Sequence, residues 1–166
     1  MIVDAPLVEY TRVCMIAALK IVGSPRDELG PKRTGLAWDI ASSAFVEPPL
    51  WPDDVDRHRT VRTLVAIAAR ESSIRNDVHG LGGECTMFQI KPRFLGLSCG
   101  PLESDAQAAT HAAMRIIRLS QSMCKEPRAW LNSYAAGPGA CDSTGAQRIS
   151  DDRAWLADEI EKQVGP

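Results

Sequence analysis

Residues 53–90 read DDVDRHRTVRTLVAIAARESSIRNDVHGLGGECTMFQI. Apolar residues recur at helical spacing over 61–68, and the three acids before them suit a helix N-terminus, where they meet the positive end of the helix dipole. At that periodicity Ser72 falls on the apolar stripe and Glu71 on its flank. We therefore expect a helix that carries the Glu71 carboxylate to the edge of a buried face, followed by a glycine-rich segment with a short strand over Thr86–Ile90.

The rest of the chain also reads as helices, separated by proline and glycine. Ser104 and Gln107 form a capping box before the clearest of them, and we expect Pro127 to open a helix that runs through Tyr134. The pattern predicts a mainly α protein with a single domain over 1–166. Helices are expected within residues 1–50, and a last helix over about 151–163.

Composition narrows the classes of partner. Lysine and arginine total 19 and aspartate and glutamate total 21, so the formal net charge is −2 and gives no electrostatic footprint for nucleic acid. No apolar run approaches the roughly 20 residues that span a bilayer. Residues 1–9 carry two acids and no lysine or arginine, so no signal peptide is expected. The cysteines form no CxxC pair and the histidines lie far apart, so we expect no metal and no cofactor.

Four of the five cysteines lie in the second half of the chain: Cys85, Cys99, Cys124 and Cys141. One or two disulfides among them and free buried thiols fit this spacing equally well. In an oxidising or exposed compartment at least one bridge is expected, because a bond after the long helix would fix the loop beyond Gly137.

Glu71 has the position of a general acid. A carboxyl group that is partly buried and lies at the C-terminal, negative end of a helix is disfavoured in its charged form, and a general acid must hold a proton. The alternative is a surface glutamate that pairs with Arg70 or Arg75. Placement on the helix leaves both interpretations open.

Three strings in order carry a resemblance to a known family. Residues 69–74, ARESSI, resemble its A-x-E-S-x-F motif; residues 83–90, GECTMFQI, resemble G-x-x-G-L-M-Q-I; and residues 133–139, SYAAGPG, resemble A-Y-N-A-G-P-G. The family is that of the soluble lytic transglycosylases and goose-type lysozymes. The resemblance covers residues 57–140, about half of the chain. It implies a lysozyme-like catalytic core over about 57–140, with a short irregular or β segment near 80–92 and an N-terminal helical extension over 1–50.

The family cleaves peptidoglycan between N-acetylmuramic acid and N-acetylglucosamine. The resemblance implies that Glu71 is the sole catalytic acid and base, that Tyr134 hydrogen-bonds near it, and that the groove lies between the Glu71 helix, the Gly80–Ile90 segment and the Tyr134 helix. Ser72 would orient the acid or contact sugar, and Met87 and Phe88 would shape the groove floor. The implied substrate-binding residues are Ser72, Met87, Phe88, Gln89 and Tyr134.

The chain departs from the family at two positions. Thr86 stands where the family has glycine, and Ala135 stands where it has a sugar-binding asparagine. Asn132 lies one helical turn earlier and is expected to supply the missing amide. Hydrolysis by water would need a second carboxylate, for which Asp77 and Glu84 are candidates. Transglycosylation needs Glu71 alone and gives a 1,6-anhydro product, and the sequence favours this route.

Two further classes of function follow from the same residues. One is a catalytically weak glycan-binding or structural domain on the same fold, such as a phage tail or virion component, which the alanine at 135 favours. The other is an unrelated helical interaction protein. The placing of Cys99, Cys124 and Cys141 also resembles lysozyme-like proteins of phage particles. That resemblance implies peptidoglycan and virion proteins as partners, and action in the bacterial cell envelope after delivery by a virion.

Overall fold

The computed structural model describes residues 5–23, 30–125, 129–137 and 139–165. Within these ranges the protein is a mainly α-helical single domain with seven α-helices, one short 3-10 helix and no β-sheet. The elements are α1 (Ala5–Ile21), α2 (Pro31–Val46), α3 (His58–Ser72), η1 (Pro92–Leu95), α4 (Cys99–Ser104), α5 (Ala106–Met123), α6 (Trp130–Ala136) and α7 (Thr144–Val164). No helix of the described chain is long and apolar enough to cross a membrane.

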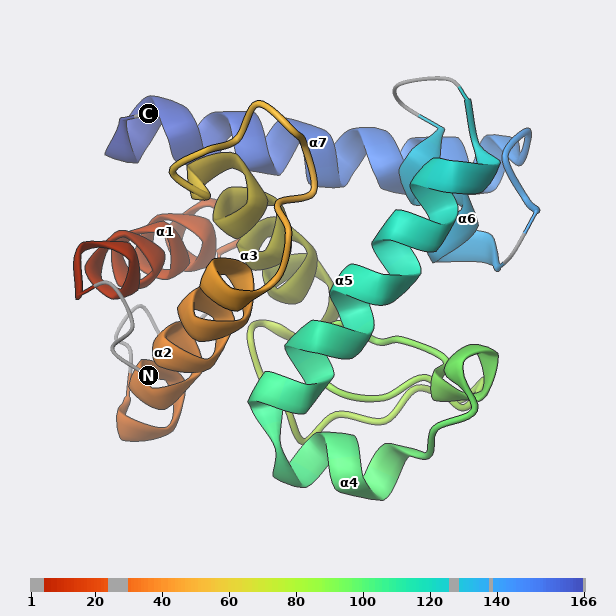
Figure 1. The fold of residues 1–166 in the computed structure, drawn as a ribbon, viewed down its shortest axis with the longest axis horizontal. Helices are drawn as coiled ribbons and strands as arrows, with labels where there is room; N and C mark the ends of the chain where they lie inside the picture. Colours follow the sequence, from red (N-terminus) through yellow and green to blue (C-terminus); the bar gives the residue numbers. More distant parts are fainter. Residues whose placement is uncertain (1–4, 24–29, 126–128, 138, 166) are drawn as a thin grey trace.

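Helix α3 lies at the centre of the fold. It packs against α1, α2 and α7, while α5 crosses the front of the molecule and contacts α2 and α6 (Figure 1). Every residue of α3 from Thr60 to Ala69 is buried, so neighbours surround the helix instead of covering one apolar stripe. The expected extension over 1–50 is part of the same core, because α1 and α2 supply residues such as Met15 and Ile40 to it.

Two of the acids before α3 cap the helix, as their position predicts. Asp54 accepts hydrogen bonds from the backbone N–H of Arg59 at 3.0 Å and of Thr60 at 2.7 Å. Asp56 accepts from the N–H of His58 at 3.1 Å. These N–H groups have no partner inside the helix, so the two carboxylates supply one. The caps fix where α3 begins, whereas its end, just after Glu71, is formed by the left-handed residue Ser73.

Other expected helix ends differ in the structure. The capping box at Ser104 and Gln107 is wrong, because α4 already includes Ser104 and the N-cap of α5 is Asp105, which accepts from the N–H of Ala108 at 2.9 Å. The short acidic side chain reaches the free N–H groups directly. The last helix begins at Thr144, before the expected residue 151, and is capped by Ser143. Pro127 lies outside the described residues, and α6 begins at Trp130.

The segment between α3 and η1 is irregular. Cys85 and Ile90 exchange two backbone hydrogen bonds of 3.0 Å, so the residues between them form a turn, and the strand expected over Thr86–Ile90 is wrong. Thr86 has φ +70° and Gln89 has φ +48°. A strand needs extended backbone at each position, whereas this left-handed conformation reverses the chain. Thr86 stands where the family that the sequence resembles has glycine, and its positive φ is a conformation that glycine adopts most easily.

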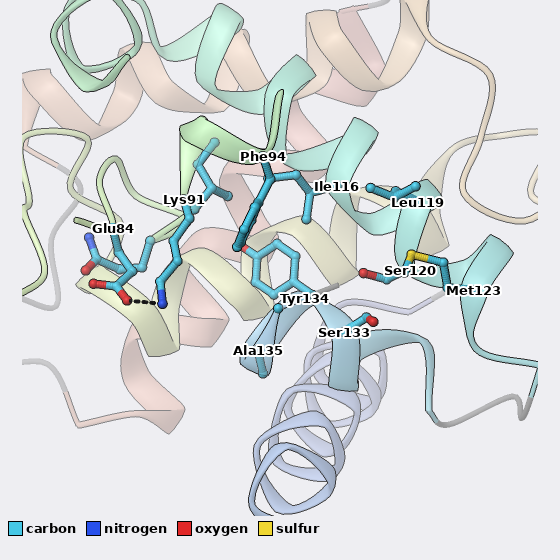
Figure 2. Close-up of a pocket in the computed structure, with 13 residues that line it drawn as sticks. Glu84, Lys91, Phe94, Ile116, Leu119, Ser120, Met123, Ser133, Tyr134 and Ala135 are labelled. Carbon is cyan, nitrogen blue, oxygen red and sulfur yellow. Dashed lines mark ion pairs between the residues drawn. The ribbon is translucent and has the colours of Figure 1, made fainter. Parts of the chain in front are cut away.

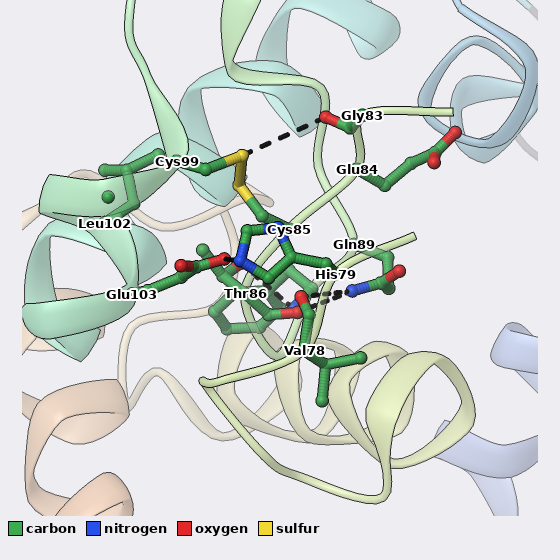
Figure 3. Close-up of a disulfide and its surroundings, with 12 residues drawn as sticks. Val78, His79, Gly83, Glu84, Cys85, Thr86, Gln89, Cys99, Leu102 and Glu103 are labelled. Carbon is green, nitrogen blue, oxygen red and sulfur yellow. Dashed lines mark hydrogen bonds and ion pairs between the residues drawn. A yellow bond between two sulfur atoms is a disulfide. The ribbon is translucent and has the colours of Figure 1, made fainter. Parts of the chain in front are cut away.

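The four cysteines of the second half form two disulfides, Cys85–Cys99 and Cys124–Cys141. The first ties the turn to the start of α4 (Figure 3). The second ties the C-cap of α5 to the chain beyond α6. Cys14 is a buried free thiol in α1.

Candidate active site

The three strings that resemble family motifs meet in space at the turn. The Ser72 hydroxyl, in the last turn of α3, lies 3.0 Å from the carbonyl oxygen of Met87. The Tyr134 hydroxyl, on α6, donates a hydrogen bond to the carbonyl oxygen of Phe88. The turn is therefore held between the end of α3 and α6. Segments far apart in the sequence thus form one site.

A pocket opens beside this junction, between the turn, η1, α5 and α6. Figure 2 shows the Tyr134 ring at its centre, next to the ring of Phe94, with a Glu84–Lys91 ion pair at one end. The expected groove had α3 as one wall, but in the structure α5 takes that place and Glu71 does not line the pocket. Its lining residues are Glu84, Gln89, Ile90, Lys91, Phe94, Ile116, Leu119, Ser120, Met123, Ser133, Tyr134, Ala135 and Gly137.

Gln89 is held in a fixed orientation at the pocket wall. Its side-chain nitrogen donates to the carbonyl oxygens of Val78 at 2.9 Å and Thr86 at 3.0 Å (Figure 3). A Cβ atom on Gly80 would lie 2.8 Å from the Gln89 side-chain oxygen, so the absence of a side chain there makes room for the amide. An amide fixed by two hydrogen bonds is a prepared contact for a polar ligand.

Glu84 and Lys91 form the charged end of the pocket. Their side chains lie 3.0 Å apart, and Glu84 also accepts from the N–H of Gly82 at 2.9 Å. Hydrogen bonding from its own backbone N–H and then from Lys91 lowers the pKa of Glu84. Glu84 was a candidate for a second carboxylate, whereas Lys91 and Phe94 were missed. The sequence feature that could have indicated Lys91 and Phe94 is their position within four residues of the end of the second string.

Glu71 takes part in a chain of four charges between α3 and α7. Its carboxylate lies 2.8 Å from the guanidinium of Arg153, which lies 2.9 Å from Asp152. Asp152 in turn lies 2.9 Å from Arg70. Neither partner expected from the sequence pairs with Glu71, since Arg70 binds Asp152 and Arg75 donates to the backbone of Ser72. Within this row of alternating charges Arg153 neutralises the Glu71 carboxylate, whose side chain is 22% exposed.

Tyr134 lies between the pocket and Glu71. Burial, and then the negative charge of Glu71, raise the pKa of Tyr134 well above its ordinary value. The phenol therefore keeps its proton and remains a hydrogen-bond donor. Its hydroxyl donates to the Phe88 carbonyl oxygen, and the negative charge of Glu71 acts on it without a direct bond between the two side chains.

Several expected sugar contacts are buried. Ser72, Met87 and Phe88 lie beneath the surface and hold the turn in place. Asn132 is also buried, and its side chain bonds to Cys141, Gln147 and Ser150. The expectation that Asn132 replaces the missing amide is therefore not met. The position of that amide, Ala135, is exposed and lines the pocket.

One group of side chains resembles a metal site by distance alone. Ligand atoms of His79, Cys99 and Glu103 lie within 4.8 Å of one another. His79 and Glu103 already form an ion pair of 2.7 Å, and the Cys99 sulfur is bonded to Cys85 (Figure 3). A metal binds the thiolate and not the disulfide, so only two of the three groups offer a ligand while this bridge is intact.

No family model, no curated protein and no solved structure matches this chain. Function is therefore argued from the side chains of the site. They offer a partly buried carboxylate at Glu71, an ionised carboxylate at Glu84, and a pocket with aromatic faces and a fixed amide. Pockets that combine apolar surface with a few oriented polar groups are typical ligand sites.

Proposed function

We propose that this protein cleaves the glycan strands of bacterial peptidoglycan, with Glu71 as the catalytic acid, on a lysozyme-like fold. The main support is that the three strings resembling family motifs lie together at one turn, joined by contacts of Ser72 and Tyr134. Residues 72, 87–88 and 134 have no local reason to meet. Their contact agrees with a site built from all three strings.

In this mechanism Glu71 protonates the oxygen of the glycosidic bond that breaks. The resulting carboxylate then takes a proton from the attacking hydroxyl. In a transglycosylase that hydroxyl is the 6-hydroxyl of the muramic acid itself, and the product is a 1,6-anhydro sugar; in a hydrolase it belongs to water. Glu71 is paired with Arg153 in this structure, so the mechanism requires that pair to open before the acid can act.

The pocket provides the binding part of the proposal. The rings of Phe94 and Tyr134 offer apolar surface for a sugar face, and Gln89 offers a fixed amide. Ala135 leaves open the position of the family's amide, so one sugar hydrogen bond is missing. Such a bond contributes about 0.5–1.5 kcal/mol, so its loss weakens binding and does not stop chemistry at Glu71.

The decisive experiment compares two isosteric variants by the clearing of purified peptidoglycan. Glu71→Gln keeps the shape of the side chain and removes the transferable proton, so the rate should fall by about 10²- to 10⁴-fold. Glu47→Gln is the matched control, since Glu47 is 25% exposed and pairs with Arg118 at 2.8 Å, as Glu71 pairs with Arg153. Wild-type lysis by a folded Glu71→Gln protein would overturn the proposal.

Mass spectrometry of the digest separates the two reactions. Anhydro-muropeptides identify a transglycosylase, which needs Glu71 alone. Reducing ends identify a hydrolase, for which ionised Glu84 is the candidate second carboxylate. In that case Glu84→Gln should also abolish cleavage.

A second candidate is a glycan-binding domain without cleavage. The ion pair between Glu71 and Arg153 favours it, because it occupies the acid. Sedimentation with insoluble peptidoglycan distinguishes the two: a binding domain sediments with the wall and releases no soluble fragment. Both candidates place the protein in the cell envelope, where an oxidising or exposed setting preserves the two disulfides. A phage particle is then the proposed carrier.

A further inference from the structure

A second pocket lies beside the first turn of α6, one helical turn before the positions that line the first pocket. Trp130 and Leu131 of α6 line it, whereas Tyr134 and Ala135 line the first pocket. Its other walls come from α3, from α7 and from Trp51 in the connection between α2 and α3, a loop that Figure 1 shows beside α3 and α7. No residue of this pocket belongs to the three family-like strings.

One wall combines aromatic surface with a cation. Trp51 and Trp130 meet edge to face with their ring centroids 5.4 Å apart. The guanidinium of Arg59 lies over Trp51, 4.0 Å from the ring centroid, and has no ion-pair partner among the described residues. A guanidinium placed over a ring face has N–H groups left for a carboxylate, which it can bind with two parallel hydrogen bonds.

Helix α7 contributes Arg153, the partner of Glu71, to the lining of the pocket. The two terminal nitrogens of Arg153 bind Glu71 and Asp152, at 2.8 Å and 2.9 Å. Its Nε atom is buried and has no hydrogen-bond partner within the part of the chain that the structure describes. An unpaired buried donor is costly, so Arg153 gains from a further acceptor. One guanidinium thus belongs both to the second pocket and to the environment of the proposed catalytic acid.

The acids of the pocket limit what it accepts. Glu161 is neutralised by Arg62 at 2.8 Å, and Asp151 accepts a hydrogen bond from Gln147 at 2.9 Å. Asp158 is the third acid in the lining. A ligand with several negative charges would be repelled, whereas one carboxylate with hydroxyl or amide donors beside it matches both signs of charge.

We propose that this pocket binds a ligand with a single carboxylate between Arg59 and Arg153, its apolar part against Trp51 and Trp130, and that the bound carboxylate draws Arg153 away from Glu71. The second half of this inference rests on the proposed function, because it makes the second pocket the place where substrate releases the acid. Acidic sugars and the C-termini of stem peptides both carry the required group. The group that the two sources share is a single carboxylate, and the probes below distinguish them.

Linkage gives a test that needs no activity. If the ligand and Glu71 compete for Arg153, removal of the Glu71 charge must tighten ligand binding, since no ion pair is broken. For a partly exposed pair the expected gain is about three- to tenfold. Titration calorimetry of wild type and Glu71→Gln measures it, with N-acetylmuramic acid and N-acetyl-D-alanyl-D-alanine as the acidic probes and N-acetylglucosamine as the neutral one.

Two arginine variants locate the site. Arg59→Gln should weaken binding of the acidic probes by about tenfold or more, since it removes a charge-assisted bidentate contact. Arg115→Gln is the matched control, because Arg115 is exposed on α5 and lines neither pocket. The acidic probe that binds more tightly identifies the source of the carboxylate.

The results separate this inference from the proposed function. Equal binding of neutral and acidic sugars, no binding of either acidic probe, or full binding by Arg59→Gln would overturn the pocket assignment, whatever the lytic activity. Equal affinity of wild type and Glu71→Gln would overturn the competition for Arg153. Tighter binding by Glu71→Gln, in a protein whose wild type releases no fragments, would support the pocket and reject the catalytic proposal.

Discussion

Replacement of Asn132 by alanine should destabilise the protein and leave substrate affinity almost unchanged. The Asn132 amide nitrogen donates to the carbonyl oxygen of Cys141 at 2.7 Å and to Gln147 at 3.0 Å, and its oxygen accepts from the Ser150 hydroxyl at 2.6 Å. Asn132 and Ser150 are both buried. Asn132→Ala therefore leaves a hydroxyl without a partner in the contact between α6 and α7.

The magnitude follows from the groups left behind. An unpaired buried hydroxyl costs about 1–3 kcal/mol, and loss of the bond to the partly exposed Cys141 adds about 0.5–1.5 kcal/mol. The free energy of unfolding should fall by about 2–4 kcal/mol. For a chain of this size that lowers Tm by roughly 5–15 °C.

A double-mutant cycle tests the reasoning. Ser150→Ala removes the group that Asn132→Ala leaves unpaired, so the double variant should lose less stability than the sum of the two single variants, by about 1 kcal/mol. Urea unfolding measures all three, and initial rates on peptidoglycan measure KM. An unchanged Tm together with a raised KM would refute the structural role and restore Asn132 as a sugar contact.

Three further predictions concern other parts of the fold. The pair Cys124→Ser and Cys141→Ser should lower the free energy of unfolding by about 3 kcal/mol, because the bridge closes a loop of 17 residues; denaturant unfolding with and without reductant checks this. Burial raises the pKa of Cys14 from 9.0 to about 12, so thiol reagents at about pH 8 should find no reactive group until the protein unfolds. The pKa of Cys14 is higher in the folded protein, about 12, than its ordinary value of 9.0 in the unfolded chain. The contribution of Cys14 to stability is therefore present below pH 9.0 and should be lost as pH rises towards about 12, which urea unfolding at several pH values can measure. Gly80→Ala should displace the Glu84 carboxylate and the Gln89 amide, because the added Cβ would lie 2.6 Å from Glu84 Oε2 and 2.8 Å from Gln89 Oε1. KM should rise several-fold with a smaller effect on Tm, since both are side-chain ends; an equal Tm loss without a change in KM would contradict this.

Local patterns predicted the parts of the site that depend on one helix. The spacing of apolar residues placed Ser72 on the buried face and Glu71 on its flank, and both positions agree with the structure. The acids before α3 also cap it as predicted. These features depend only on residues that are neighbours in the sequence, because helical periodicity and the free N–H groups at a helix end are local properties.

The turn shows where local reasoning stopped. The segment Thr86–Ile90, in which Met87, Phe88 and Ile90 are apolar, fits a short strand as well as a buried turn. The left-handed backbone of Thr86 and Gln89 arises because Ser72 and Tyr134 hold the turn from two directions. Asn132 was misjudged for a similar reason. Its buried partners Gln147 and Ser150 follow 15 and 18 residues later, on a helix whose early start the sequence did not reveal.

The sequence by itself determined the helical class and the position of Glu71 at the end of its helix, and it supplied the three strings on which the proposed function rests. Only the tertiary structure decided what surrounds that carboxylate. Arg153 reaches Glu71 across 82 positions of chain, and it does so because α7 packs along α3. The charge next to an acid depends on which helices pack together, and no periodicity within one helix contains that information. For the same reason, only the packing of α7 against α3 and α6 shows that a single arginine joins Glu71 to a second pocket.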